Sequence, residues 1–221
     1  MDRSKWPAKA DFPIARPGLF YICGAIAVTA LLFFMGWILP AMTAFFITLF
    51  VCWFFRDPDR NIPEDENVIV SPADGKILLV ENLDKNDFTD GPCIKVSIFM
   101  NVFNVHVNRI PFTGKIIKTE YFPGKFFNAS FDKSSKDNER NALVISTDKA
   151  QSSYAVVQIA GLIARRIVCR TGRGDYLKTG DRYGMICFGS RLDIYLPSST
   201  DISVLPGEKV AAGSSIIGYM K

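Results

Sequence analysis

His106 is the only histidine in the 221-residue sequence, and its type makes it the first candidate for acid–base chemistry. An imidazole takes up and releases a proton near neutral pH, which no other side chain does at its unperturbed pKa. His106 alternates with Asn104 and Asn108, a spacing that fits one face of a strand or the mouth of a cleft equally well. A lone histidine is more often structural than catalytic, so a catalytic role needs partners from elsewhere in the chain.

Two turn-like segments supply such partners. Asp74 lies in the segment Ser-Pro-Ala-Asp-Gly at residues 71–75, where proline followed by Asp-Gly is ordinary turn chemistry. Ser190 follows Gly189 between two expected strands. Asp74, His106 and Ser190 form a candidate Asp-His-Ser set in that chain order. The Gly-x-Ser-x-Gly nucleophile elbow is absent, which argues against a conventional serine esterase.

Composition excludes several metal and cofactor chemistries. The single histidine excludes a multi-histidine zinc site, and the five cysteines contain no Cys-x-x-Cys pair for a zinc ribbon or a thioredoxin-like site. We therefore expect no metal site. An odd number of scattered cysteines favours reduced thiols and a cytosolic soluble part. The glycine-rich segment 171–175 has neither the Walker lysine nor a Gly-x-Gly-x-x-Gly pattern, so it predicts no nucleotide site.

The charge balance argues against a nucleic-acid partner. The sequence has 26 Lys and Arg against 22 Asp and Glu, a formal net charge of +4, without a basic stripe that carries interleaved aromatic residues. A modest basic excess suits an anionic membrane surface instead.

A long uncharged block stands near the N-terminus. No Asp, Glu, Lys, Arg or His occurs in residues 17–55. Residues 18–39 can cross a hydrocarbon core of about 30 Å as a helix, whereas residues 41–55 reach only about 22 Å. Gly36 and Pro40 divide the block. We therefore expect a hydrophobic hairpin of two helices that either spans the bilayer or re-enters it.

The flanks of this block predict its orientation. Basic residues precede it and follow it, Arg16 and Arg56 among them, so the positive-inside rule places both ends in the cytoplasm. The expected organisation is a cytoplasmic tail at residues 1–16, a membrane hairpin at 17–55 and a domain at 56–221. We expect the protein in the cell (inner) membrane, with this domain on the cytoplasmic face.

Beyond residue 55 the sequence changes to short runs rich in Val, Ile, Phe and Tyr, separated by Gly, Pro, Asn and Asp. These lengths and turn signals predict a mostly β domain of many short strands. Strands are expected at residues 68–70, 76–80, 94–99, 115–121, 142–146, 154–159, 167–169, 185–188, 192–196 and 216–219. Residues 71–77 and 205–218 share a turn–strand pattern that is common in small barrel-sandwich hybrids, so we expect a fold of that kind.

Taken in order, several motifs resemble those of one enzyme family. They are Phe54–Pro58, the 71–75 turn, Phe103–Pro111, Asp137–Asn141, Gln158–Gly161 with Ala164–Arg166, and Arg182–Arg191. The chain resembles phosphatidylserine decarboxylase proenzymes of the short bacterial and archaeal type. The resemblance runs nearly end to end, and its specificity comes from the order and spacing of the motifs.

The resemblance implies an enzyme that makes its cofactor from its own chain. The Ser190 hydroxyl would attack the Gly189 carbonyl, the chain would be cut between residues 189 and 190, and Ser190 would become a pyruvoyl group. The fragments would remain together as the α and β subunits. The pyruvoyl carbonyl would form a Schiff base with phosphatidylserine from the bilayer and accept electrons as carbon dioxide leaves, giving phosphatidylethanolamine. The other Gly-Ser pair, Gly213-Ser214, would leave too short a tail.

The resemblance also implies roles for Asp74 and His106, with one departure. The family pattern assigns the aspartate and a histidine to self-cleavage, and a histidine to decarboxylation as well. Longer members have His-x-x-His-x-Pro, whereas this chain has Arg109 at the second histidine position. Either His106 serves both steps or Asp74 takes a larger share. Arg109 and Arg140 are candidates for binding the substrate, because arginine binds carboxylate and phosphate bidentately.

Two other functions stay open. One is a non-catalytic, membrane-anchored binding module of the lipoyl/biotinyl-like type, although no carrier-lysine turn is recognisable. The other is a membrane-anchored serine hydrolase that uses the same three residues without self-cleavage. Whether two copies associate as a homodimer is equally open.

Overall fold

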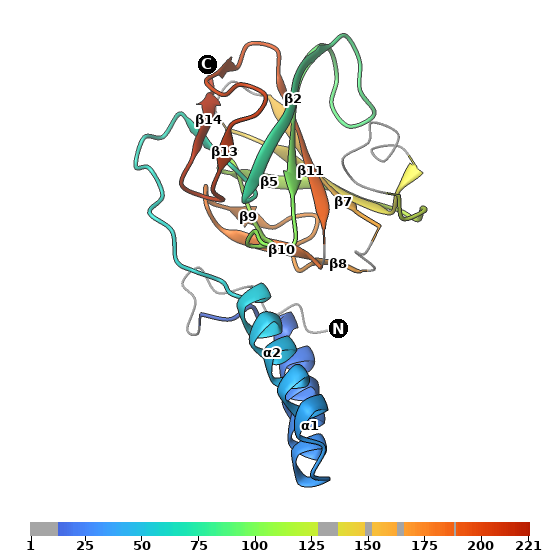
Figure 1. The fold of residues 1–221 in the computed structure, drawn as a ribbon. Helices are drawn as coiled ribbons and strands as arrows, with labels where there is room; N and C mark the ends of the chain where they lie inside the picture. Colours follow the sequence, from blue (N-terminus) through green and yellow to red (C-terminus); the bar gives the residue numbers. More distant parts are fainter. Residues whose placement is uncertain (1–12, 128–136, 149–151, 163–165, 188) are drawn as a thin grey trace. The chain divides into compact units, whose positions relative to one another are not determined.

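The computed structural model describes residues 13–127, 137–148, 152–162, 166–187 and 189–221, and it divides into two compact units. Two helices form the smaller unit, within residues 9–59, and antiparallel strands form the larger one, from residue 60 onwards (Figure 1). Residues 1–12 of the expected tail lie outside the described residues.

The smaller unit is a helical hairpin. The short 3-10 helix η1 (Arg16–Gly18) leads into α1 (Leu19–Phe34), and α2 (Ile38–Phe54) follows after a turn. Gly36 in this turn has a φ of 75°, a left-handed conformation that glycine adopts readily. Pro40 lies in the first turn of α2, where its missing N–H leaves no hydrogen bond unmade. The expected break at Pro40 is therefore wrong, and the second helix begins at Ile38.

Polar and close contacts join the two arms of the hairpin. Thr29 Oγ1 and Thr48 Oγ1 lie 3.0 Å apart, which links α1 to α2 at mid-length. At the open end, the Ala15 N–H donates to the Phe55 carbonyl over 2.8 Å. Gly18 lies against the Phe55 ring so closely that a Cβ would stand 2.3 Å from a ring carbon. Any larger residue at position 18 would push the arms apart.

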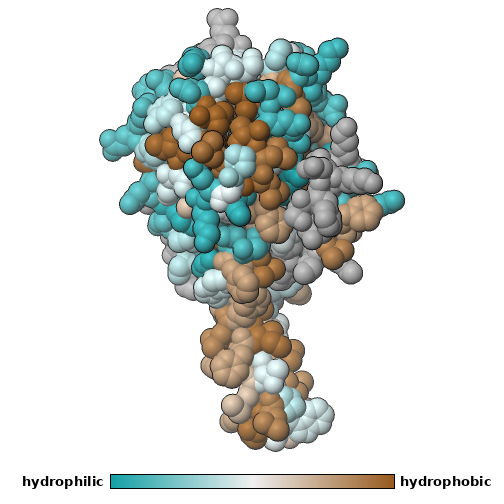
Figure 2. Space-filling model, turned by 45° about the horizontal axis from the view of Figure 1, so that its top comes forward, coloured by the Kyte–Doolittle hydropathy of each residue, from teal (hydrophilic) through white to brown (hydrophobic). Residues whose placement is uncertain are grey.

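Both helices of the hairpin expose large apolar side chains, and apolar surface covers much of the side that Figure 2 shows. Phe20 and Phe34 are each 84% exposed, and Leu39 is 78% exposed. The helix Arg16–Phe34 is long and apolar enough to cross a membrane, while Ile38–Phe54 is a shorter apolar helix. Helices that are apolar on all sides occur in the interior of large proteins or in membranes.

The larger unit is built on one eight-stranded antiparallel sheet that curls on itself (Figure 1). Its strands, in spatial order, are β13 (Lys209–Val210), β2 (Gly75–Leu83), β3 (Cys93–Met100), β11 (Ser190–Pro197), β7 (Ser153–Ala160), β6 (Arg140–Ser146), β5 (Gly114–Phe122) and β9 (Tyr176–Leu177). The expectation of a mostly β domain is confirmed.

Two three-stranded sheets complete this unit. One contains β1 (Val68–Val70), β14 (Ile216–Tyr219) and β12 (Asp201–Ile202), and the other contains β4 (Val107–Arg109), β10 (Arg182–Cys187) and β8 (Arg166–Cys169). β4, β9, β12 and β13 are not among the strands expected from sequence. Each has only two or three residues, too few to show an alternating pattern.

An apolar core lies on the concave side of the large sheet. Leu192, Ile194 and Leu196 of β11 are fully buried in it. Burial of each such side chain stabilises the fold by about 1.5–3 kcal/mol. Because side chains alternate along a strand, Ser190 at the start of β11 points to this same side.

The two segments with the shared turn–strand pattern pair with each other. Lys209 is the register partner of Lys76, and Ile216 is that of Val70. The Gly213 N–H also donates to the Ser71 carbonyl over 2.7 Å. The barrel-sandwich-hybrid fold expected from the two segments stays a prediction.

Candidate functional site

Asp74, His106 and Ser190 all lie at one end of the large sheet. β2 begins directly after Asp74, β3 ends at Met100, and β11 begins at Ser190. Met100 and Ser190 are register partners. Neighbouring strands lie about 4.8 Å apart, so the main chains of β2 and β11, on either side of β3, lie about 10 Å apart. The antiparallel topology thus brings two chain segments, more than a hundred residues apart in sequence, to the same edge.

His106 reaches this edge through the turn that follows β3. Asn101 and Asn104 close the turn, since the Asn104 N–H donates to the Asn101 carbonyl and Asn104 Oδ1 accepts from the Asn101 N–H. The chain then enters β4, which pairs with β10. The Ile186 N–H donates to the His106 carbonyl over 3.4 Å, so His106 is tied to the strand that leads toward Ser190.

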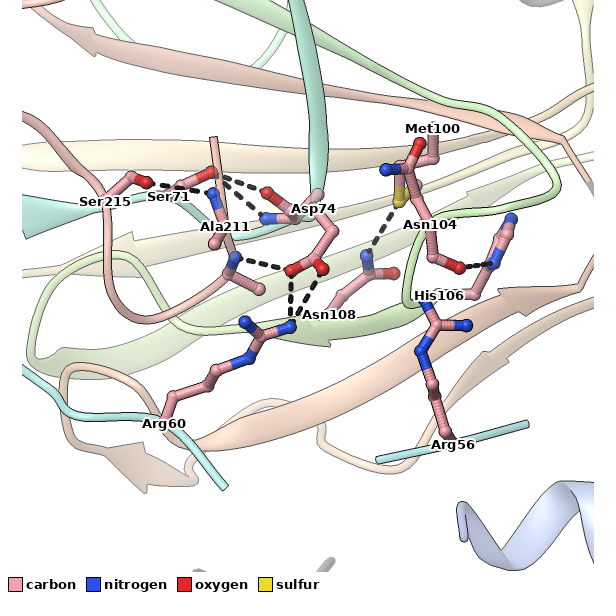
Figure 3. Close-up of polar contacts among 12 residues, drawn as sticks. Arg56, Arg60, Ser71, Asp74, Met100, Asn104, His106, Asn108, Ala211 and Ser215 are labelled. Atoms are coloured by element: carbon pink, nitrogen blue, oxygen red, sulfur yellow. Dashed lines mark hydrogen bonds and ion pairs between the residues drawn. The ribbon is translucent and has the colours of Figure 1, made fainter. Parts of the chain in front are cut away.

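Asp74 is held by three hydrogen bonds (Figure 3). Arg60 Nη2 donates to both carboxylate oxygens, over 3.0 Å to Oδ1 and 2.8 Å to Oδ2. The Ala212 N–H donates to Oδ1 over 2.8 Å. The carboxylate is therefore fixed in an ion pair with one guanidinium. Arg60 was not recognised from sequence, because it lies in an irregular segment that carries no pattern.

The turn that carries Asp74 is locked to a second turn from the C-terminal part. Ser71 Oγ donates to the Ala73 carbonyl over 2.7 Å, and the Ser71 N–H donates to the Ser215 carbonyl over 2.8 Å. Ser215 Oγ in turn accepts the Ala211 N–H over 2.9 Å. The turn expected at residues 71–75 is therefore held by hydrogen bonds on both sides of Asp74.

The His106 ring is completely buried, and its surroundings select one tautomer. Nδ1 lies 2.9 Å from the Asn104 carbonyl oxygen (Figure 3). A carbonyl oxygen only accepts, so Nδ1 carries the hydrogen, and in the neutral ring the lone pair resides on Nε2. Nε2 is accordingly the atom through which His106 can take up a proton.

Ser190 is completely buried, and within the described part of the chain its Oγ has no hydrogen-bond partner. A buried hydroxyl without a partner costs about 1–3 kcal/mol, and such groups often serve a reaction. Gly189 before it has a φ of +56°, in the left-handed region. Phe188, which completes the Phe-Gly-Ser motif, lies outside the described residues.

A buried ion pair fixes the strand immediately after Ser190. Arg191 Nε donates to Asp193 Oδ1 over 2.6 Å, and Arg191 Nη2 donates to Ser97 Oγ over 2.8 Å. Arg191 and Asp193 are both completely buried. These bonds join β11 to β3 next to the Gly-Ser bond, on the face of the sheet opposite to Ser190.

The two arginines expected to bind substrate lie in different places. Arg109, the last residue of β4, is 3% exposed and donates through Nη1 to the Gly180 carbonyl over 3.0 Å. Arg140 pairs in register with Ile159, the partner of Arg191, so it lies on the face opposite to Ser190. There its guanidinium stands 4.3 Å over the Phe122 ring. The structure does not bring Arg140 together with Ser190, and both substrate roles stay predictions.

Cys187, the cysteine nearest to Ser190 in the sequence, is a poor nucleophile at neutral pH. Burial raises the pKa of the Cys187 thiol to about 11, so it stays protonated at neutral pH. Among the residues described, no group of three or more His, Cys, Asp and Glu side chains is arranged to hold a metal ion.

Comparison with known proteins points to one family. The family model for phosphatidylserine decarboxylase matches residues 47–218. A phosphatidylserine decarboxylase proenzyme of Syntrophus aciditrophicus is 50% identical over 214 residues, which cover 95% of this chain and 99% of that protein. Proteins of the same name from Geobacter metallireducens and Cupriavidus pinatubonensis are 46% and 48% identical, over 96% and 94% of this chain and 98% and 95% of their own lengths.

Proposed function

Since this chain belongs to the phosphatidylserine decarboxylase family, we propose that Ser190 is the residue from which it forms its pyruvoyl group, with Asp74 and His106 as the groups that move protons. The chain is a phosphatidylserine decarboxylase, a carboxy-lyase made as a proenzyme. One observation supports this choice of residues above the others. The Ser190 hydroxyl is buried and has no hydrogen-bond partner within the described residues. It lies at the end of the sheet that also carries Asp74 and His106.

Self-cleavage begins with an N-to-O acyl shift. Ser190 Oγ adds to the carbonyl carbon of Gly189, its proton passes to His106 Nε2, and negative charge develops on the Gly189 carbonyl oxygen. The C–N bond then breaks, and the Ser190 nitrogen takes the proton from His106. The product is an ester between Gly189 and the Ser190 side chain, with no net gain or loss of atoms.

A β-elimination completes the cut. A base removes the proton from the Ser190 Cα, the Cβ–Oγ bond breaks, and Gly189 leaves as a free carboxylate. Water then hydrolyses the dehydroalanine at position 190, releasing ammonia and leaving the pyruvoyl group. The resulting chains run from residue 1 to 189 and from 190 to 221, the β and α subunits.

The residues present fit this group, because an orphaned buried hydroxyl stands where it must form. When formed, the pyruvoyl group supplies an electrophilic carbonyl that draws off the electrons left as carbon dioxide departs. His106 Nε2 returns a proton to the substrate carbon that has lost its carboxylate. Asp74 is held by Arg60 at the same edge of the sheet, where its carboxylate oxygens can accept a proton or a hydrogen bond. Arg109, three residues from His106, is the candidate for the substrate's carboxylate or phosphate.

The hairpin at residues 17–55 is proposed to lie in the inner membrane, with the domain at 56–221 in the cytoplasm. Exposed apolar side chains on both helices and basic residues at both flanks support this assignment. The substrate is a bilayer lipid, so an anchor keeps the site at the depth of the head groups.

Intact-mass analysis of the purified protein tests the cleavage site. We expect two fragments divided between residues 189 and 190, with a carbonyl at the new N-terminus that reacts with hydroxylamine. Ser190→Ala should stay a single chain without decarboxylase activity, while the control Ser214→Ala should be cut normally. A single uncut chain with full decarboxylase activity would overturn the assignment of the pyruvoyl group to Ser190.

A further inference from the structure

A line of three amide side chains runs through the core toward the site. Asn141 Nδ2 donates to Gln158 Oε1 over 3.3 Å, and Gln158 Nε2 donates to Asn108 Oδ1 over 2.8 Å. Asn108 Nδ2 then donates to Met100 Sδ over 3.6 Å (Figure 3). Gln158, Asn108 and Met100 are completely buried, and Asn141 is 6% exposed.

This arrangement fixes which end of the Asn108 amide faces the site. Gln158 donates to the oxygen of Asn108, so the Asn108 NH2 group must point the other way, toward Met100. A thioether sulfur is a weak acceptor, and within the described residues it is the acceptor that this N–H group has. A buried amide donor usually finds a carbonyl or carboxylate. The Asn108 NH2 group therefore makes only a weak hydrogen bond here and could donate to a stronger acceptor.

The Asn108 Nδ2 group points toward Met100, which lies beside Ser190 in the sheet. Met100 is the register partner of Ser190 on the neighbouring strand, and Asn108 is two residues from His106. Gly184, the register partner of Asn108, leaves room for the Gln158 amide, since a Cβ there would stand 2.8 Å from Gln158 Nε2. The absence of a side chain at Gly184 therefore leaves the space in which Gln158 reaches Asn108.

We propose that Asn108 is the hydrogen-bond donor for the Gly189 carbonyl oxygen as negative charge develops on it during self-cleavage, and that Gln158 is its positioning residue. The proposal rests on the assignment of cleavage to Gly189-Ser190. In the uncut chain the Asn108 N–H donates to Met100 Sδ. When Ser190 Oγ adds to the carbonyl, the Gly189 oxyanion is a far stronger acceptor, and the same N–H donates to it instead. No further reactant is needed, because the step only redirects an existing N–H.

The test measures the rate of self-cleavage, with the full-length protein made by cell-free synthesis, pulse-labelled and followed on gels. Removal of one donor to an oxyanion slows such reactions by about 10²–10³-fold, so Asn108→Ala should cut about 100-fold more slowly than the parent. Gln158→Glu, which keeps the shape but loses the N–H that orients Asn108, should cut more slowly by a smaller factor.

Met100→Leu separates this role from a structural one. If Asn108 only stabilises the core through Met100, loss of the sulfur should slow cleavage as much as loss of the amide. If Asn108 serves the oxyanion, Met100→Leu should cut at the parent rate or faster, because the donor is released. Melting curves of each variant in a Ser190→Ala background show whether it folds.

The outcomes are distinguishable from those of the assignment itself. A parent protein that is not cut between residues 189 and 190 would refute the cleavage assignment, whatever Asn108 does. A parent that is cut there, with a folded Asn108→Ala variant cut within threefold of its rate, would overturn the role of Asn108. Equal slowing by Asn108→Ala and Met100→Leu would also overturn it.

Discussion

His106 has to move protons through a single nitrogen, because Nδ1 is committed to the Asn104 carbonyl. With no second histidine in the chain, no other imidazole can replace it. We expect His106→Ala to lose both self-cleavage and turnover, each by more than about 100-fold, the range of general acid–base catalysis. Fragment mass and carbon dioxide release from detergent-dispersed phosphatidylserine measure the two steps. A variant that still cuts and turns over normally would show that His106 is structural.

Arg60 matters through Asp74 and should therefore act on the rate without touching the reacting bond. In Arg60→Ala the carboxylate keeps only the Ala212 N–H, so its orientation loosens. We expect self-cleavage to slow by about 10-fold, a loss of about 1.4 kcal/mol in the barrier. Arg60→Lys should retain part of the rate, since one ammonium can still pair with the carboxylate. The matched control Arg173→Ala, at an exposed position, should cut at the parent rate.

The rate at which Cys187 is alkylated should depend on pH and report its burial close to the proposed cleavage site. Burial raises the pKa of its thiol from 9.0 to about 11, so the reactive thiolate is scarcer at every pH below that value. At pH 8 the difference amounts to about 100-fold in thiolate fraction, and iodoacetamide should modify folded Cys187 that much more slowly than the same thiol in urea. The gap should narrow as the pH rises toward 11. Equal rates in folded and unfolded protein would contradict the buried placement.

The first residues of β11 must stay in place if the chain is cut as proposed, and the buried pair Arg191–Asp193 is positioned to hold them. Breaking a buried pair by removal of one charge costs about 3–5 kcal/mol. We expect Asp193→Asn to lower the free energy of unfolding by that amount, measured by urea titration in detergent with uncut Ser190→Ala protein. Its control is Glu120→Gln, which breaks the exposed pair with Lys118 and should cost about 0–1 kcal/mol. Similar losses in both variants would argue against a buried pair.

Strand-level sequence patterns predicted the element order well but not the geometry of the site. β2, β3, β7 and β11 contain short runs rich in Val, Ile, Leu and Tyr, and the prediction of a mostly β domain followed from these runs. β4 has three residues and no such signal, yet it carries Asn108 and Arg109.

Asp74, His106 and Ser190 were identified by residue type and by family resemblance. Their shared edge depends on the non-local pairing of β2, β3 and β11, which no local pattern encodes. For the same reason the contacts of Arg60 and Gln158 could not be predicted from sequence, although Gln158 lies in one of the family motifs. Each acquires its role only through a partner that the fold brings to it.

At the scale of the whole molecule, the length of the second helix bears on how deep the proposed membrane hairpin reaches. The sequence assigned its second arm to residues 41–55, a reach of about 22 Å. In the structure α2 starts at Ile38 and has 17 residues, so it extends about 25 Å. A bilayer core of about 30 Å can thin by this small difference, and Trp37 at the turn suits an interface. We therefore expect both arms to span the membrane.

Labelling of the turn decides between spanning and re-entry. Met35, in the turn, is 52% exposed and can be replaced in a cysteine-free background as Met35→Cys. A spanning hairpin presents this thiol to the outer surface, so a membrane-impermeant maleimide should label it in intact cells. The control Arg56→Cys, at the end proposed to face the cytoplasm, should be labelled only after the cells are opened. Protection of Met35→Cys in intact cells, with labelling after detergent, would show that the hairpin re-enters and that the catalytic unit is held by one leaflet.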